Sequence, residues 1–348
     1  MLSKSAAPLS GLRLRAARLL AEAGCDSSAE LSSIGVGGNN RIYYVNADPR
    51  HYVLKEYFRH PGDSRDRLGA EFAFAQFAWS NGIRCIPEPI AGDTAAGIGL
   101  YGHINGERIL PGTLCRADIE QALEFIISLN RCKTLPEARA LPICSEACFS
   151  ISTHIDVVRG RLDRLTGIIP ESPIDHELET FIQSRLIPAY KTVTERIMAQ
   201  ISEARISSDA ELAAEERIIS PSDFGFHNAL RRQDGTIAFL DFEYAGWDDP
   251  AKLTGDFFNQ VAVPVSLSYK DEVFNRVADI LPNRKAALMR MHLLLPLYRI
   301  KWCCILLNDF LPVDSDRRDF AQGPAVERKK GQLDRAWSLL ASLEELEI

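Results

Sequence analysis

The residue pattern changes once along this chain, near Gly106, and that change constrains the fold more than any other feature. Before Gly106, short β-branched and aromatic runs such as RIYYVNAD and HYVLKEYF are separated by turn residues. One helical stretch lies among them, SRDRLGAEFAFAQFAWSNG, which begins with a Ser cap and ends at Asn81-Gly82. After Gly106, apolar residues recur at helical spacing in almost every segment. The pattern predicts an α+β fold with a small strand-rich lobe followed by a larger helical lobe.

We expect three parts along the chain. Residues 1–29 form an N-terminal helical extension, residues 30–105 the strand-rich lobe, and residues 106–348 the helical lobe. The N-terminal segment has scattered arginines and no uninterrupted apolar core, which is typical of an amphipathic helix rather than a signal peptide. The most apolar stretch, MHLLLPLYRIKWCCILL, is interrupted by a proline and two cations, so we expect a buried helix there. These features predict a cytoplasmic protein with no membrane partner.

Composition and charge exclude some classes of protein. The 348 residues carry a net charge of -7, with 46% hydrophobic and 25% charged residues, as in an ordinary soluble globular protein. No basic face is implied, so nucleic acid is not an expected partner. The eight cysteines do not form two CxxC pairs at zinc spacing, and we expect buried or free thiols in a reducing compartment.

Two neighbouring segments, SPSDFGFHNAL and TIAFLDFEYAGWDDP, carry the most suggestive chemistry. They place Asp223 five residues before Asn228, and Asp241 at the end of an apolar run. Phosphoryl transfer from ATP needs a carboxylate that positions and deprotonates a hydroxyl, and oxygen ligands that hold Mg²⁺. These three residues suit those roles. Taken alone, the segments are equally consistent with two turn residues and an aspartate that ends a strand.

The strand-rich lobe contains further residues that suit phosphate binding. GVGGNNRIYYV is a glycine turn between strands, where backbone N–H groups are able to approach phosphates. Lys55 follows on the next strand and shares a strand face with Val53. A lysine on a buried face requires a counter-charge, which Glu71 on the following helix is placed to supply. Each of these two residues alone is equally consistent with a solvated surface position, whereas the ordered set is much less expected by chance.

The ordered set resembles the aminoglycoside phosphotransferase and choline kinase family, which has the protein-kinase-like fold. The similarity covers residues 30–310, and its most specific segments are GGNNRIYYV, IPEPI, DFGFHN and FLDFEYAGWDDP. The resemblance implies a two-lobed, protein-kinase-like architecture with a nucleotide-binding N-lobe and a C-lobe that carries the catalytic loop and the acceptor-binding helices. It also implies ATP and Mg²⁺ as cofactors, and a hydroxyl of a small molecule as the phosphoryl acceptor.

The resemblance assigns roles to the residues of both lobes. Asp223 would be the catalytic base, while Asn228 and Asp241 would bind Mg²⁺. Lys55 would hold the α- and β-phosphates of ATP. Glu71 would orient Lys55.

The same resemblance assigns the nucleotide contacts of the N-lobe. Gly37, Gly38 and Asn40 would lie over the phosphates. The segment LYGHI would be the hinge, where backbone groups from Tyr101 to His103 meet the edge of the adenine.

The chain departs from the family pattern at two places. The family usually has His two positions before the catalytic aspartate, within H-G-D, whereas this chain has Pro221 there. That His mainly supports the loop, and because proline fixes φ and stiffens a loop, we expect activity to be retained. The family often has Asp where Lys252 stands, and Asp256 is a candidate to support the loop instead. For His227 we expect a role in loop packing or substrate contact rather than in metal binding.

Three classes of function remain open for such a chain. A small-molecule kinase is favoured over a protein kinase because only 15 positions separate Asp241 from Asp256 and no A-P-E follows. A nucleotide-binding pseudokinase without turnover is the non-enzyme alternative, although candidates for the base, the lysine and the metal ligands are all present.

The acceptor is expected to be a sugar, polyol or amino alcohol, with an aminoglycoside antibiotic as the alternative. A polycationic acceptor requires many carboxylates, whereas the expected acceptor helix carries Arg299 and Lys301. The acidic segment ESPIDHELET weakens this argument, unless its carboxylates simply favour a helix start. The sequence does not indicate the oligomeric state.

Overall fold

The computed structural model describes residues 7–22, 24, 30–36, 40–47, 49–59, 65–311 and 325–346. These residues belong to two compact units. The first contains Met1–Ile109, Cys115–Ser145 and Pro221–Gly246, and the second contains Leu110–Leu114, Glu146–Ser220 and Trp247–Ile348. The segment that carries both aspartate motifs therefore packs within the unit that contains the N-terminal strands.

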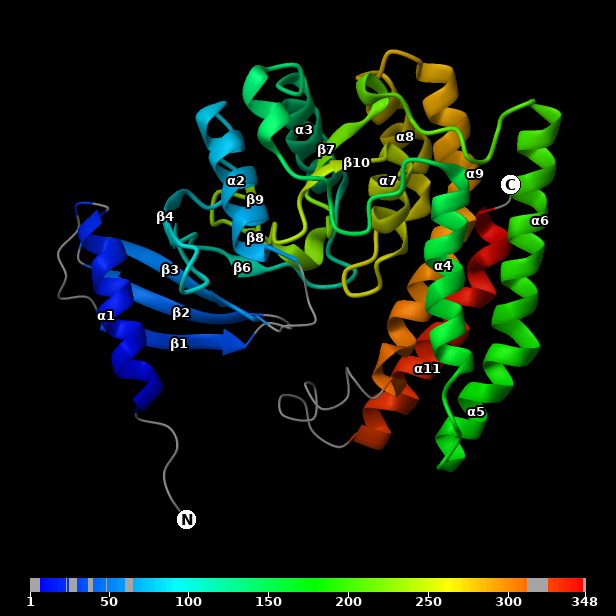
Figure 1. Cartoon of the computed structure of the whole chain (residues 1–348), viewed down its shortest axis with the longest axis horizontal. Coiled ribbons are helices and arrows are strands. Elements are labelled where there is room, and N and C mark those ends of the chain that lie inside the picture. Colours follow the sequence, from blue (N-terminus) through cyan, green and yellow to red (C-terminus); the bar gives the residue numbers. More distant parts are fainter. Residues whose placement is uncertain are drawn as a thin grey trace. The chain divides into compact units, whose positions relative to one another are not determined.

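The first unit is built on an antiparallel sheet with the strand order β1-β2-β3-β5-β4. Its strands are β1 (Glu30–Val36), β2 (Asn40–Ala47), β3 (Arg50–Tyr57), β4 (Pro89–Asp93) and β5 (Ile98–Gly102). Helices α1 (Ala7–Glu22) and α2 (Arg67–Ser80) pack against this sheet (Figure 1). Successive residues of a strand point to opposite faces, so Leu54 faces α1 whereas Lys55 faces α2.

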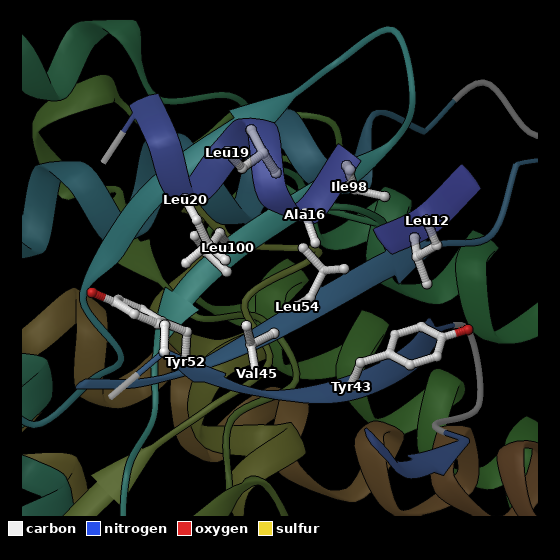
Figure 2. Close-up of a cluster of buried hydrophobic side chains, with 11 residues drawn as sticks. Leu12, Ala16, Leu19, Leu20, Tyr43, Val45, Tyr52, Leu54, Ile98 and Leu100 are labelled. Carbon is white, nitrogen blue, oxygen red and sulfur yellow. The ribbon is translucent and has the colours of Figure 1, made fainter. Parts of the chain in front are cut away.

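An apolar stripe on α1 covers one face of the sheet, as Figure 2 shows. The stripe follows helical spacing and consists of Leu12, Ala16, Leu19 and Leu20. It packs on sheet residues that share one strand face, namely Tyr43, Val45, Tyr52, Leu54, Ile98 and Leu100. The amphipathic helix expected near the N-terminus is therefore part of the core of the first unit.

Helix α2 begins two residues later than its expected cap. Its N-cap is Asp66, whose Oδ1 accepts a hydrogen bond from the Gly69 N–H at 2.9 Å, so the prediction of a Ser cap is wrong. Asp and Ser are about equally good N-caps, and the aspartate lies closer to the first buried turn. The predicted end is correct, because Asn81 caps the helix and Gly82 has a φ of 83°.

A second, small sheet in the first unit has the strand order β6-β8-β9. Its strands are β6 (Glu107–Arg108), β8 (Ala229–Arg231) and β9 (Ile237–Phe239). Helix α3 (Arg116–Arg131) packs on β9, and Asp118 of this helix pairs with Arg231 of β8 at 2.7 Å. The apolar run before Asp241 thus forms a strand that ends at Phe239, which leaves Asp241 in the loop after it.

The second unit is mainly helical, as the sequence predicts. Its helices are α4 (Ile151–Thr166), α5 (Pro173–Phe181), α6 (Ile187–Glu203), α7 (Pro250–Asn259), α8 (Lys270–Ala278), α9 (Arg284–Leu306) and α11 (Ala325–Ala341). A two-stranded sheet joins β7 (Ile218–Ser220) and β10 (Gly246–Asp248). Helix α9 packs on α4, α6, α7, α8 and α11 and has many buried residues, so it is the buried helix that the apolar stretch predicts (Figure 1). Among the described residues, no helix is long and apolar enough to cross a membrane.

Buried ion pairs connect α7 to α9. The ammonium group of Lys301 lies 2.9 and 3.0 Å from the two carboxylate oxygens of Asp256. Trp302 Nε1 donates to the same carboxylate at 2.9 Å, and Lys252 lies 3.5 Å from it. Lys252 in turn pairs with Asp248 at 2.9 Å. Asp256 thus binds Lys252 of its own helix and Lys301 and Trp302 of α9, while its support of the catalytic loop stays a prediction.

Lys301→Met is expected to destabilise the protein by about 3–5 kcal/mol, because it leaves a buried carboxylate without its main counter-charge. Denaturant unfolding monitored by circular dichroism measures the loss. The double variant Lys301→Met/Asp256→Leu removes the uncompensated charge and is expected to recover part of the stability. A double variant less stable than the single one would contradict this account.

Candidate functional site

Buried phenyl rings hold both aspartate motifs in place. The ring of Phe239 stacks on Phe125 of α3 at a centroid separation of 4.9 Å, and Phe224 lies 5.2 Å from Phe239. The ring of Phe242 lies 4.7 Å from Phe74 of α2. Each motif aspartate is followed directly by one of these rings. Burial of the rings therefore fixes the backbone on which the aspartates stand.

Lys55 of β3 lies between two carboxylates. Its Nζ is 2.7 Å from Glu71 Oε1 and 3.0 Å from Asp241 Oδ1. Burial lowers the pKa of Lys55, but the charges of Asp241 and Glu71 outweigh it and raise the pKa above its usual value. Lys55 therefore stays protonated, and the strand lysine, the helix glutamate and the strand-end aspartate are in direct contact.

Two tyrosines form a second layer behind this lysine. Tyr57 donates to Glu71 Oε2 at 2.6 Å, and its hydroxyl lies 2.9 Å from that of Tyr101. Burial and the nearby Glu71 charge raise the pKa of both phenols well above the usual value, so both remain neutral. With one oxygen on Lys55 and the other on Tyr57, Glu71 is fixed in position.

The first motif forms a compact loop around Asp223. Asn228 Nδ2 donates to the Asp223 backbone carbonyl at 3.0 Å and lies 3.2 Å from its Oδ2. His227 Nε2 lies 3.2 Å from the other carboxylate oxygen, Oδ1. The Asp223 side chain remains 43% exposed, so the carboxylate is held by protein groups and still faces solvent. The structure thus places His227 against the proposed base.

The second motif brings Asp241 beside this loop. The N–H of Leu240 donates to the Asn228 carbonyl at 2.8 Å, which ties the two motifs together through their backbones. Asp241 has a φ of 66° and Ser222 a φ of 69°, in a region that residues other than glycine rarely adopt. Such strain is often found at functional sites.

The donor set fits a magnesium ion bound together with phosphates. Because Asn228 Nδ2 is used as a donor, its Oδ1 is the amide acceptor that remains for a metal. Asp241 supplies a carboxylate, and Mg²⁺ commonly uses one or two such ligands with water and phosphate oxygens. Within the described ranges, no three or more His, Cys, Asp or Glu side chains cluster closely enough to hold a metal ion by themselves. Phosphate oxygens and water would therefore complete the coordination of an ion here.

The predicted nucleotide contacts have different outcomes. Gly37 and Gly38 lie outside the described residues. The N–H groups of Gly102 and His103 donate to Glu88 and His51 within the sheet, at 2.8 and 3.0 Å. Those two amides are therefore already used within the protein, and the contact of Tyr101 to His103 with an adenine stays a prediction.

Asn40 and Glu243 form a contact between residues far apart in the sequence. Asn40 Nδ2 donates to Glu243 Oε2 at 3.2 Å, and both residues are buried. Arg67 Nε lies 3.5 Å from the same oxygen. The Asn40 side chain thus ties the start of β2 to a residue two positions after Asp241. The separation of 203 positions explains why no sequence pattern revealed this pair.

Asn40→Ala is expected to raise the KM for ATP about ten-fold while kcat changes about two-fold or less. A hydrogen bond to a charged group contributes about 1.5–3 kcal/mol, and this one holds the start of β2 rather than the Lys55 or Asp223 side chain. Steady-state kinetics with varied ATP measure both constants. Asn46→Ala, on the exposed side of the same strand, is the matched control. A large loss of kcat with an unchanged KM would contradict the anchoring role.

Comparisons with known proteins identify the fold. No protein-family model and no curated protein matches the sequence. Among solved structures, a spectinomycin phosphotransferase in complex with ADP and spectinomycin superposes with a TM-score of 0.61 at 13% identity, covering 95% of this chain and 98% of that one. The choline kinase LicA from Streptococcus pneumoniae gives a TM-score of 0.58 at 12% identity, covering 97% and 100%. A choline/ethanolamine kinase family protein from Mesorhizobium loti gives 0.56 at 14%, covering 96% and 98%.

These similarities extend over nearly the whole chain. The protein has the two-lobed, protein-kinase-like fold of the aminoglycoside phosphotransferases and choline kinases, with an antiparallel N-terminal sheet and a mainly helical C-terminal part. The predicted fold class is confirmed.

Proposed function

We propose that this protein transfers the γ-phosphoryl group of ATP to a hydroxyl of a small molecule. The observation that carries the proposal is the contact of Lys55 with both Glu71 and Asp241, beside a half-exposed Asp223. In phosphoryl transfer the protein has little covalent chemistry to perform. It mainly positions the reactants, stabilises charge and provides a base. One unit of the fold supplies all of these groups.

Each residue has one task in the proposed reaction. Asp223 accepts the proton of the acceptor hydroxyl as it attacks, and Asn228 and His227 hold the Asp223 carboxylate in place. Lys55, fixed by Glu71, binds phosphate oxygens. Mg²⁺ held by Asn228 and Asp241 would neutralise charge on the phosphates.

The departure before the proposed base is compatible with catalysis. Pro221 replaces the His of the family pattern, and its carbonyl accepts the Asp223 N–H at 3.1 Å. Ser222 stands where the family has Gly and adopts the left-handed φ that glycine favours. The loop thus keeps a conformation of glycine type without the usual residues.

The structure bears on two sequence arguments about the acceptor. Lys301 is neutralised by Asp256, so it does not disfavour a cationic acceptor. In the acidic segment, Asp175 caps α5 through Ser172 and pairs with Lys329 at 3.1 Å, so it is engaged in holding helices together. Sugars, polyols and amino alcohols remain the proposed acceptors, with aminoglycosides as the alternative.

An ATP-consumption screen over sugars, polyols, amino alcohols and aminoglycosides tests this proposal, with the mass of each product measured. We expect ADP release that depends on one acceptor class and on Mg²⁺. Nucleotide binding without acceptor-dependent turnover in any class would support the pseudokinase alternative. Higher kcat/KM for aminoglycosides than for the other acceptors would overturn the proposed acceptor class but not the reaction.

A further inference from the structure

One buried cation of the helical unit differs from the others. In the described part of that unit, Lys252, Arg290 and Lys301 are buried, and each has a carboxylate within 3.0 Å. Arg299 is only 4% exposed, yet no carboxylate of the described residues forms an ion pair with it. Buried charges are normally paired, because removing a charge from water is costly. Arg299 therefore calls for a partner.

The hydrogen bonds of Arg299 leave one nitrogen unused. Its Nε donates to Asn259 Oδ1, and Nη1 donates to the Ser342 hydroxyl and, at 3.5 Å, to the Ser342 carbonyl. These acceptors are neutral. A guanidinium has five N–H groups, and the two on Nη2 have no acceptor among the described residues. Burial lowers the pKa of Arg299, although an arginine starts so high that it remains charged at neutral pH.

Arg299 lines a cavity of about 810 Å³ within the helical unit. The end of α7, residues 260–267, α11 and the 3₁₀ helix η7 (Ser342–Leu346) form its walls. The apolar part of the lining includes Phe258, Val265, Leu267 and Leu339. The size and the single buried charge match small-molecule sites, in which apolar walls surround a few polar anchors.

Other polar groups at the cavity are already engaged or lie at its rim. Gln260 binds backbone groups of Ala262 and Val263, and Ser338 donates to the Asp334 carbonyl. Glu345 is exposed and attracts Arg299 only through space. Among the charged residues that line the cavity, Arg299 is buried, whereas Asp334, Arg335 and Glu345 are exposed.

We propose that this cavity binds a small molecule that bears a carboxylate or phosphate group, with Arg299 as its anchor. Arginine binds both groups well because its planar N–H donors match their oxygens. The anion pairs directly with the Arg299 guanidinium, and the apolar walls cover the rest of the ligand. The proposal is independent of phosphoryl transfer, since it concerns binding within the helical unit alone.

Calorimetric titration with three related probes tests the proposal. Glucuronate and glucose 6-phosphate carry the two anionic groups, and glucose is the neutral control. Saturating ADP and Mg²⁺ are present throughout, so that the proposed nucleotide site is filled. We expect at least one anionic probe to bind ten-fold or more tightly than glucose, and the identity of that probe distinguishes carboxylate from phosphate.

Three variants locate the binding. Arg299→Gln is expected to lose the preference for the anion, whereas Arg335→Gln, which changes an exposed arginine at the same cavity, is expected to keep it. Ser342→Asp places a carboxylate beside Arg299 and is expected to abolish anion binding while the arginine is kept. This variant tests the proposal even if Arg299→Gln fails to fold. No anion preference in the wild type, or a preference that survives in both Arg299→Gln and Ser342→Asp, would overturn the proposal.

Discussion

Asp223→Asn is expected to reduce kcat by about a hundred- to ten-thousand-fold, the usual contribution of a positioned general base. The amide has nearly the same shape as the carboxylate, so the hydrogen bond from Asn228 Nδ2 to the backbone carbonyl of residue 223 is retained. What the variant loses is the group that accepts the proton of the attacking hydroxyl. Single-turnover kinetics with the acceptor found in the screen measure the chemical step directly.

Binding measurements separate this loss from a damaged nucleotide site. The Kd for ADP with Mg²⁺ is expected to stay within about three-fold of the wild-type value, well under the 1.4 kcal/mol that a ten-fold change represents. Asp234→Asn, in the exposed turn between β8 and β9, is the control for the same chemical change outside the site. A wild-type kcat in Asp223→Asn would show that this residue is not the base.

Asp241→Asn is expected to abolish turnover and to weaken nucleotide binding that depends on Mg²⁺. A metal ion contributes several kcal/mol of charge stabilisation during phosphoryl transfer, so we expect kcat/KM to fall about a thousand-fold or more. The substitution also removes the carboxylate that lies 3.0 Å from Lys55 Nζ. Nucleotide titrations with and without Mg²⁺ measure the metal-dependent part of binding.

The metal-free titration provides the control for Asp241→Asn. In the presence of a chelator, the variant is expected to bind ADP at least as well as the wild type, because a negative charge beside the phosphates has been removed. Lys55 keeps Glu71 as its partner at 2.7 Å, so it is not left unpaired. An unchanged response to Mg²⁺ in the variant would contradict the assignment of Asp241 as a metal ligand.

The order of chemical groups along the sequence anticipated much of the candidate site. Lys55 and Glu71 stand on a strand and a helix, where strand alternation and helix faces fix the direction of side chains. The resemblance to a known family supplied the long-range pairing that local patterns lack, since Lys55 and Asp241 are 186 positions apart. The apolar spacing of α1 and α9 likewise indicated helices before any contact was known.

Contacts without a local rule were not predictable from the sequence. Asn40 was expected over the phosphates, yet its side chain donates to Glu243. Arg299 and Lys301 look alike in the sequence, two positions apart on α9. Only packing shows that Lys301 meets Asp256, 45 positions away, whereas Arg299 meets neutral acceptors and a cavity. The difference depends on which neighbouring helix faces each side chain.

The central claim is that this fold and site transfer phosphate to a small molecule. Phosphorus NMR of a reaction with ATP, Mg²⁺ and the acceptor from the screen follows ATP, ADP, free phosphate and the phosphorylated product at the same time. We predict that the phosphorylated acceptor and ADP form at equal rates, that little free phosphate appears, and that Asp223→Asn forms neither at a comparable rate. Formation of ADP and free phosphate at the same rate with the acceptor omitted, or no consumption of ATP with any acceptor, would contradict the account.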